Sequence, residues 1–227
     1  MGVRLPRWVW VGTGLLACAA GMVNVVGYLG FEHQAVTHLT GTTTLLGAAL
    51  AAGDARALLR LGGVALAFVL GAALSGVIVQ DSTLRLGRRY GVALVLESAL
   101  LFAAIPLFAR GHMGGPLLAA MACGLQNAMA TTYSGAVVRT SHLSGMFTDL
   151  GIGLGHALRG MPLQSRRLLL CGLVIAGFFA GAVAGALLFA RLGPLALAVP
   201  AAATGAAGLG YAAFRHVQLR RGAAAGR

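Results

Sequence analysis

The sequence predicts an all-helical, polytopic membrane protein built from two internal repeats. Of its 227 residues, 58% are apolar and only 10% are charged, whereas a soluble domain carries about a quarter charged residues. The apolar residues form runs long enough to cross a bilayer, and polar motifs between these runs occur twice. Because this composition leaves too little polar surface for a water-soluble particle, a soluble enzyme is excluded.

Six apolar runs reach the length of about 20 residues that a membrane-spanning helix needs. We expect these helices at 8–29, 57–80, 90–109, 116–133, 168–190 and 193–214. The first run follows Arg4 and Arg7 as a secretory signal would, but it is too long for a signal core and similar runs follow it. Two shorter apolar stretches, 42–53 and 146–158, predict helices that cannot span the membrane alone.

The two halves of the chain share an ordered set of motifs. A Gly-x-x-Asn motif ends at Asn24 and again at Asn127. The segment Thr-His-Leu-Thr-Gly at 37–41 recurs as Ser-His-Leu-Ser-Gly at 141–145. The copies lie 103 to 104 residues apart. We therefore expect one integral membrane domain made of two repeats, which cover residues 1–109 and 110–227.

The segments that contain the repeated histidines predict interruptions in the helical structure. Residues 34–44 and 138–148 are rich in Thr, Ser, Val and Gly, and each leads into a short helix. Irregular backbone is tolerated in hydrocarbon only where protein or a watery cavity satisfies its polar groups, so the two segments should meet inside the bundle. Thr40 and Ser144, each followed by glycine, occupy the positions expected for helix N-caps. The alternative is that both segments are loops outside the membrane.

The predicted site is a polar pocket between these two segments. Two helix N-termini near the midplane of the bilayer would favour an anionic solute, as in transporters with discontinuous helices. The candidate residues are Asn24, Thr37, His38, Thr40, Gly41, Thr44, Asn127, Ser141, His142, Ser144, Gly145 and Thr148. The asparagines could instead orient the interrupted backbone, and the histidines could instead be hydrogen-bonded structural residues.

Four ionisable residues in the predicted membrane segments are candidates for coupling to protons. Ionisable groups there are costly and commonly functional, and His38 and His142 can exchange a proton near neutral pH. Glu97 lies near the middle of its predicted span and has no repeated counterpart. Asp149 is placed in the first turn of the second short helix, where it could simply serve as a cap. Arg139 could neutralise either carboxylate or attract an anion.

The sequence predicts no enzymatic activity, no cofactor and no metal site. Two histidines are too few for a metal site, and no Ser-His-Asp order, Cys-x-x-Cys pair or HExxH motif occurs. The net charge of +12 comes from arginines that punctuate apolar runs, a pattern of cytoplasmic membrane loops and not of a nucleic-acid-binding surface. The expected partners are a small-molecule or ion substrate and the lipid bilayer, without nucleic acid. Two faces of small residues, Gly177, Gly181 and Gly185 and also Ala67, Gly71 and Ser75, predict close packing of neighbouring helices and would also suit a homodimer.

Two topologies fit the distribution of arginines equally well. If the short helices re-enter on one side, six spans remain, three per half, and the repeats are inverted. If the short elements cross, eight segments result and the repeats are parallel. Both topologies place twelve arginines and both termini in the cytoplasm and four arginines outside, with Arg139 within the predicted membrane segments. We favour inverted repeats, because such symmetry is a common basis for alternating access.

The repeated motifs together are similar to those of a known family. They are Gly-Met-Val-Asn-Val-Val-Gly-Tyr-Leu at 21–29, Val-Thr-His-Leu-Thr-Gly at 36–41, Gly-Leu-Gln-Asn-Ala at 124–128, and Thr-Ser-His-Leu-Ser-Gly at 140–145 with Thr-Asp-Leu-Gly at 148–151. They resemble the YoaK family of bacterial inner-membrane proteins, the domain of unknown function 1275. The resemblance covers nearly the whole chain and implies a multi-pass protein of the bacterial inner membrane. It implies no function and no functional residue.

From the residues we predict a secondary transporter that moves a small polar solute across the bacterial inner membrane, with possible coupling to protons. The two helix N-termini favour an anion or a carboxylate metabolite. An anion-selective channel with the same site is the nearest alternative. The alternatives of another class are a membrane-embedded enzyme, which needs acid and base groups converging on one cavity, and a membrane scaffold protein, which needs no polar cavity.

Overall fold

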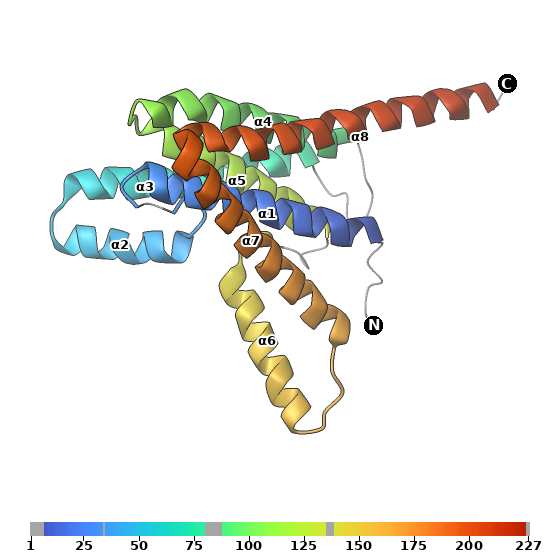
Figure 1. Ribbon diagram of the computed structural model, residues 1–227, viewed down its shortest axis with the longest axis horizontal. Helices are drawn as coiled ribbons and strands as arrows, with labels where there is room; N and C mark the ends of the chain where they lie inside the picture. Colours follow the sequence, from blue (N-terminus) through green and yellow to red (C-terminus); the bar gives the residue numbers. More distant parts are fainter. Residues whose placement is uncertain (1–6, 34, 80–87, 135–138, 226–227) are drawn as a thin grey trace.

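The computed structural model describes residues 7–33, 35–79, 88–134 and 139–225. Every regular element in these ranges is helical, which confirms the predicted all-α class (Figure 1). The elements are α1 (Arg7–Gly30), α2 (Leu39–Ala51), α3 (Ala55–Val79), α4 (Arg88–Ala109), α5 (Gly114–Tyr133), α6 (Leu143–Leu158), α7 (Ser165–Leu192), the 3-10 helix η1 (Gly193–Leu197) and α8 (Ala198–Ala225).

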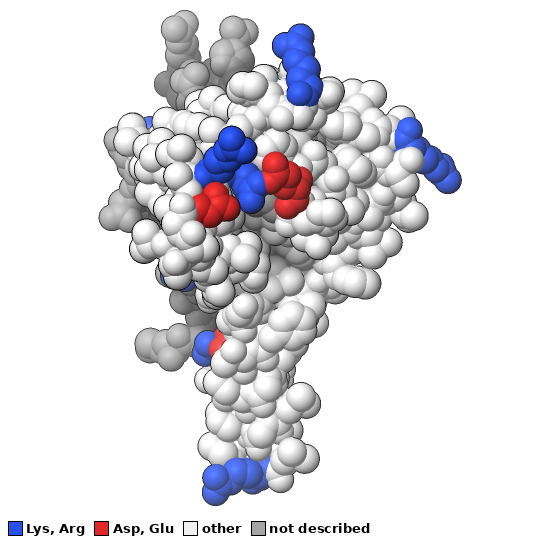
Figure 2. All heavy atoms as spheres, turned by 90° about the vertical axis from the view of Figure 1, so that its left-hand side faces the viewer, with Lys and Arg blue, Asp and Glu red and all other residues white. Residues whose placement is uncertain are grey.

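Several of these helices are suited to a membrane. Four helical stretches of the described chain are long and apolar enough to cross one, namely Trp8–Gly30, Ala55–Val79, Arg89–Ala109 and Ser165–Phe214. The last stretch combines α7, η1 and the first part of α8. Figure 2 shows a face of the molecule on which charged side chains form a few separate groups and the remaining surface is uncharged. These features are those of a helical membrane protein.

The two short helices begin earlier than the sequence predicted. Both α2 and α6 start three residues before the expected position, and their N-cap residues are His38 and His142. The prediction of Thr40 and Ser144 as N-caps is therefore wrong. The backbone N–H of Thr42 already donates a helical hydrogen bond of 3.0 Å to the carbonyl of His38, and the Thr42 hydroxyl donates a second one of 3.1 Å to the same carbonyl, so its side chain is satisfied inside the helix.

Close contacts at glycine join helices from different halves of the chain. Gly181 of α7 lies against the backbone carbonyl of Cys18 on α1, and Gly71 of α3 lies against the carbonyl of Met121 on α5. A Cβ atom at either glycine would collide with the carbonyl oxygen. The predicted small-residue faces are thus confirmed as surfaces for close helix packing.

The order of these contacts gives the directions of the helices. Gly177 of α7 faces Gly14 of α1, and one turn later Gly181 faces Cys18, so α1 and α7 run parallel. The same order makes α3 parallel to α5, whereas α4 and α8 run antiparallel. In the view of Figure 1, α1, α4 and α7 run from right to left, and α3, α5 and α8 run back. The start of α1 and the end of α8 therefore lie at the same end of the bundle.

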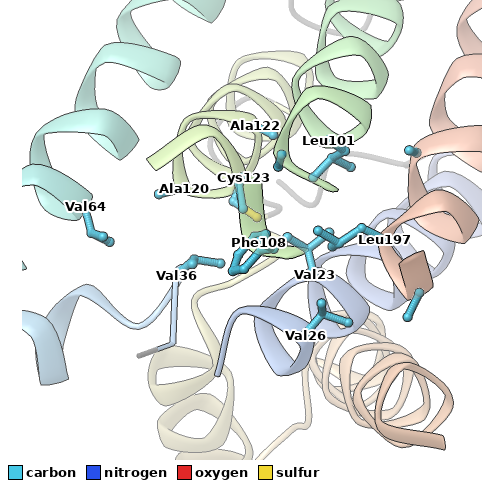
Figure 3. Packing of buried hydrophobic residues seen from close by; sticks show 14 residues of the cluster. Val23, Val26, Val36, Val64, Leu101, Phe108, Ala120, Ala122, Cys123 and Leu197 are labelled. Carbon is cyan, nitrogen blue, oxygen red and sulfur yellow. The ribbon is translucent and has the colours of Figure 1, made fainter. Parts of the chain in front are cut away.

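The chain between α1 and α2 returns into the protein interior. It reverses direction at Glu32 and His33, whose φ angles of 45° and 55° lie in the left-handed region. The Glu32 carboxylate pairs with Arg60 of α3 and anchors this turn. Val36 is then fully buried, and its side chain points towards Phe108 in the hydrophobic core (Figure 3). Val36 and Thr37 are thus buried in the bundle, whereas Glu32, His33 and His38 on either side of them are exposed.

Candidate functional site

A polar cavity of about 360 Å³ lies where the two interrupted segments meet. Its wall is formed by the segments before α2 and α6, by the first turns of these helices and by one face of α5. The structure brings seven of the predicted site residues to this wall: Thr37, His38, Thr40, Asn127, Ser141, His142 and Ser144. Whether these residues bind a solute stays a prediction, but they share one cavity.

Two helix N-termini open onto the same cavity. The first backbone hydrogen bonds of α2 and α6 run from the N–H groups of Thr42 and Met146 to the carbonyls of His38 and His142. The N–H groups before them have no partner within the helix. No side chain of the described residues caps either N-terminus. The partial positive charge at both helix ends therefore acts on the cavity and favours a negatively charged occupant.

The two histidines have matching geometry. The φ and ψ angles are −92° and 66° at His38 and −92° and 58° at His142. Each imidazole ring folds over the glycine three residues later, so a Cβ atom at Gly41 or Gly145 would collide with the ring. These glycines do not line the cavity but give the rings room beside it. Because neither ring makes a hydrogen bond within the described chain, nothing in the structure favours a hydrogen-bonded structural role for the histidines.

The repeated asparagines occupy different environments. The Oδ1 atom of Asn24 accepts hydrogen bonds from the backbone N–H of Thr37 at 3.0 Å and from its hydroxyl at 2.8 Å. Asn24 thus holds the first interrupted segment and does not line the cavity. Asn127 lines the cavity, and its Oδ1 atom is buried without a hydrogen-bond partner among the residues described.

Two predicted hydroxyl residues lie outside the cavity. Thr44 of α2 donates a hydrogen bond of 3.0 Å to the carbonyl of Thr40. Thr148 of α6 donates one of 2.9 Å to the carbonyl of Ser144. Both side chains are exposed and satisfy the carbonyl one turn earlier in their own helix. The two hydroxyl groups are therefore satisfied within their own helices.

Neither candidate carboxylate lines the cavity. Glu97 is buried in α4 with 1% of its surface exposed, and its Oε2 atom has no hydrogen-bond partner in the described chain.

Asp149 lies in the second turn of α6, because this helix begins earlier than predicted. Its carboxylate pairs with Arg167 of α7. The arginine nitrogens lie 2.9 to 3.1 Å from the carboxylate oxygens. Arg139 is therefore not the partner of Asp149, and it lines the cavity instead.

We expect the Asp149–Arg167 pair to hold the α6–α7 hairpin closed. Replacing Asp149 with asparagine should lower the free energy of unfolding by about 1 kcal/mol, because a partly exposed ion pair contributes little more than this. Thermal unfolding in detergent measures the loss. Exchanging the two charges in the double variant Asp149→Arg/Arg167→Asp should restore part of the stability. A double variant less stable than Asp149→Asn would contradict the pairing.

Several wall residues were not among the predicted site residues. They are Leu39, Phe68, Ala128, Thr131, Thr132, Arg139 and Leu143. Thr131 follows Asn127 by four residues and therefore lies on the same helix face, where its hydroxyl donates a hydrogen bond of 2.7 Å to the Asn127 carbonyl. This helical spacing could have identified it from the sequence. No Asp or Glu of the described chain lines the cavity, so Arg139 gives it a positive charge.

The polar cavity contrasts with another hollow of the described structure, which is mainly apolar. A hollow of about 530 Å³ between α1, α4, α5 and α8 is lined mainly by apolar side chains, including Leu16, Met22 and Val199, and holds none of the predicted residues. No group of three His, Cys, Asp or Glu side chains that could hold a metal ion occurs in the part of the chain that the structure describes. The polar cavity is therefore the candidate site.

Comparison with known proteins assigns a family but no activity. The sequence model of one family, described as a protein of unknown function (DUF1275), matches residues 13–210. No curated protein and no solved structure matches the chain. The matched range contains both interrupted segments and every residue that lines the polar cavity.

Proposed function

The chain belongs to the DUF1275 family, whose description assigns no function, and we propose that it is a secondary transporter for a small anion. The observation that carries the proposal is the polar cavity of about 360 Å³ at the meeting point of two interrupted helical elements. This volume is at the small end of the range for ligand sites. Interrupted helices whose N-termini point at a solute are the recurring device of secondary transporters.

The chemistry of the cavity wall favours an anion. Arg139 supplies a permanent positive charge, and its guanidinium group can bind a carboxylate through two parallel hydrogen bonds. The N-termini of α2 and α6 add partial positive charge, and hydroxyl groups add neutral donors. We propose a carboxylate metabolite or another small oxyanion as the solute.

We further propose that the protein consists of two inverted repeats with six spans. The spans would be α1, α3 and α4 in residues 1–109, and α5, α7 and α8 in residues 110–227. In support, Gly21 of α1 lies against the carbonyl of Phe178 on α7, and Gly124 of α5 lies against the carbonyl of Phe68 on α3. Each proposed span of the first half runs opposite to its counterpart in the second half, as inverted repeats require.

In this topology α2 and α6 begin at the same cavity and lead to opposite sides of the membrane. Both termini lie on one side, and the arginine distribution favours the cytoplasm of a bacterial cell for that side. We assign proton coupling to His38 and His142, which line the cavity, and not to Asp149, whose carboxylate is held by Arg167. An anion-selective channel with the same wall would differ in having no change of conformation during transport.

The role of Arg139 can be tested with reconstituted protein. Proteoliposomes that contain the wild-type chain should take up labelled acetate, lactate or succinate. Replacing Arg139 with glutamine should weaken the apparent affinity for the transported anion by about 10- to 100-fold, because hydrogen bonds to charged groups contribute this much. Arg110→Gln is the matched control, since Arg110 is exposed in the α4–α5 turn and does not line the cavity. Equal affinities of the two variants, or no uptake of any of the three anions by the wild type, would contradict the proposal.

A further inference from the structure

We propose that Asn24 and Asn127 are alternating clamps, one for each interrupted segment, and that only one of them is closed at a time. In the structure the clamp between Asn24 and Thr37 is closed, the clamp between Asn127 and Ser141 is open, and the polar cavity is the space beside the open clamp. This inference rests on the proposed transport function. It names the two positioning residues that would exchange the open and closed roles between the two states of the transporter.

The closed clamp is defined by two hydrogen bonds. Asn24 Oδ1 accepts both of them from Thr37, at 3.0 Å from the backbone N–H and at 2.8 Å from the hydroxyl. Thr37 is 8% exposed, and the preceding residue, Val36, is fully buried in the core. The ion pair between Glu32 and Arg60 fixes the turn that leads into the segment. The first half of the chain therefore holds its interrupted segment tightly against α1.

The open clamp has the same parts without the bonds. Asn127 and Ser141, the counterparts of Asn24 and Thr37 in the repeated motifs, both line the cavity. The Asn127 Oδ1 atom is buried without a hydrogen-bond partner in the described ranges. Thr140, the counterpart of Val36, is 1% exposed, and its hydroxyl also lacks a partner there. Because buried polar groups in proteins are almost always paired, these two orphaned atoms indicate bonds that form in another state.

The position of the cavity agrees with this asymmetry. Asn127, Ala128, Thr131 and Thr132 form the α5 part of its wall. Their counterparts on α1, which are residues 24, 25, 28 and 29, contribute nothing to the wall. Closing the second clamp would bring Ser141 towards Asn127 across the cavity and remove this space. Opening the first clamp would create the equivalent space along α1.

Inverted repeats turn such an exchange into alternating access. When two halves with opposite orientation exchange their conformations, a central site that opened to one side of the membrane opens to the other. The clamps supply the energetic bias, because each state gains the hydrogen bonds of one clamp and loses those of the other. Removing one clamp should therefore shift the population towards the state in which the other clamp is closed.

The test measures how accessible the cavity is, without needing a known solute. Thr132 on the cavity wall is replaced with cysteine in a chain whose three native cysteines are changed to alanine. A membrane-impermeant maleimide is then added to each side of reconstituted vesicles, and the rate of labelling is recorded. When both asparagines are unchanged, the cysteine at position 132 should be labelled from one side of the membrane. Asn24→Ala should shift the equilibrium constant between the two states by about 5- to 30-fold, the equivalent of one or two kcal/mol, and should slow this labelling as the accessible state becomes less populated.

Two further variants separate a clamp from a merely structural residue. Asn127→Ala removes the clamp that is already open, so labelling should stay at the wild-type rate or rise. Asn24→Asp keeps an acceptor oxygen for both Thr37 donors and should restore the labelling that Asn24→Ala loses. Shifts of the same direction in Asn24→Ala and Asn127→Ala, or no shift in Asn24→Ala, would overturn the proposal.

A second arm of the experiment separates this proposal from the proposed function. Excess acetate, lactate or succinate should protect the cysteine at position 132 if the cavity binds a small carboxylate. Slower labelling in Asn24→Ala but not in Asn127→Ala, without any protection, would support the clamps and contradict the carboxylate as solute. Protection without this difference between the two variants would support the solute site and overturn the clamps.

Discussion

Replacing Gly181 with alanine is expected to be among the most destabilising single changes in this protein. Gly181 lies against the backbone carbonyl of Cys18 where α7 crosses α1, so a methyl group can be accommodated only if one helix moves. Overpacking of this kind costs about 3 kcal/mol when backbone must shift. For a chain of this size we expect the Tm to fall by about 10 °C. Thermal unfolding of the purified protein in detergent measures this change.

Two other variants test whether the loss of stability comes from the close contact between the helices. Gly172→Ala on the same helix has no atom within 4 Å of its added Cβ, so its Tm should equal that of the wild type or exceed it slightly. Gly71→Ala should lose as much stability as Gly181→Ala, because Gly71 meets the carbonyl of Met121 in the crossing of α3 with α5. A much smaller loss in Gly71→Ala would contradict the proposed correspondence of the two crossings.

The features that sequence reasoning predicted well depend on local hydrophobicity. The first predicted span, 8–29, differs from α1 by one residue at each end, because its apolar run is long and bounded by polar residues. The repeated histidine motif also predicted two segments that the structure brings to one cavity. That expectation followed from the free-energy cost of backbone groups without hydrogen bonds in a membrane. This cost applies equally to both copies of the motif.

The features that sequence reasoning missed depend on tertiary contacts. Asn24 and Asn127 stand in equivalent motifs, yet only Asn24 is hydrogen-bonded to its segment, and no residue near either one reveals the difference. Asp149 was predicted as a capping or coupling residue, but its partner Arg167 lies 18 residues away on the next helix. The C-terminal helix was predicted at 193–214, whereas Gly193, with a φ of 57°, ends α7 and α8 starts five residues later.

The largest loss of transport is predicted for replacement of the two histidines of the proposed site. Replacing His38 or His142 with alanine should lower the rate of anion uptake into proteoliposomes by about 10-fold each, because each variant removes a ring N–H that can donate a hydrogen bond to the anion. The double variant should lose about 100-fold if the two rings contact the same solute independently. The thermal stability of the single variants should stay near that of the wild type, since neither ring makes a hydrogen bond within the described residues.

Proton coupling adds a dependence on pH. If protons move together with the anion, uptake by the wild type should rise as the external pH falls, because the proton gradient then drives the anion inward. The alanine variants should lose this rise. Gly41→Ala and Gly145→Ala are the matched variants, because each keeps its imidazole but displaces the ring from the helix end. If the rings serve transport through their position, these glycine variants should lower uptake without abolishing its dependence on pH. Unchanged uptake in both His38→Ala and His142→Ala would exclude the cavity between α2 and α6 as the transport site.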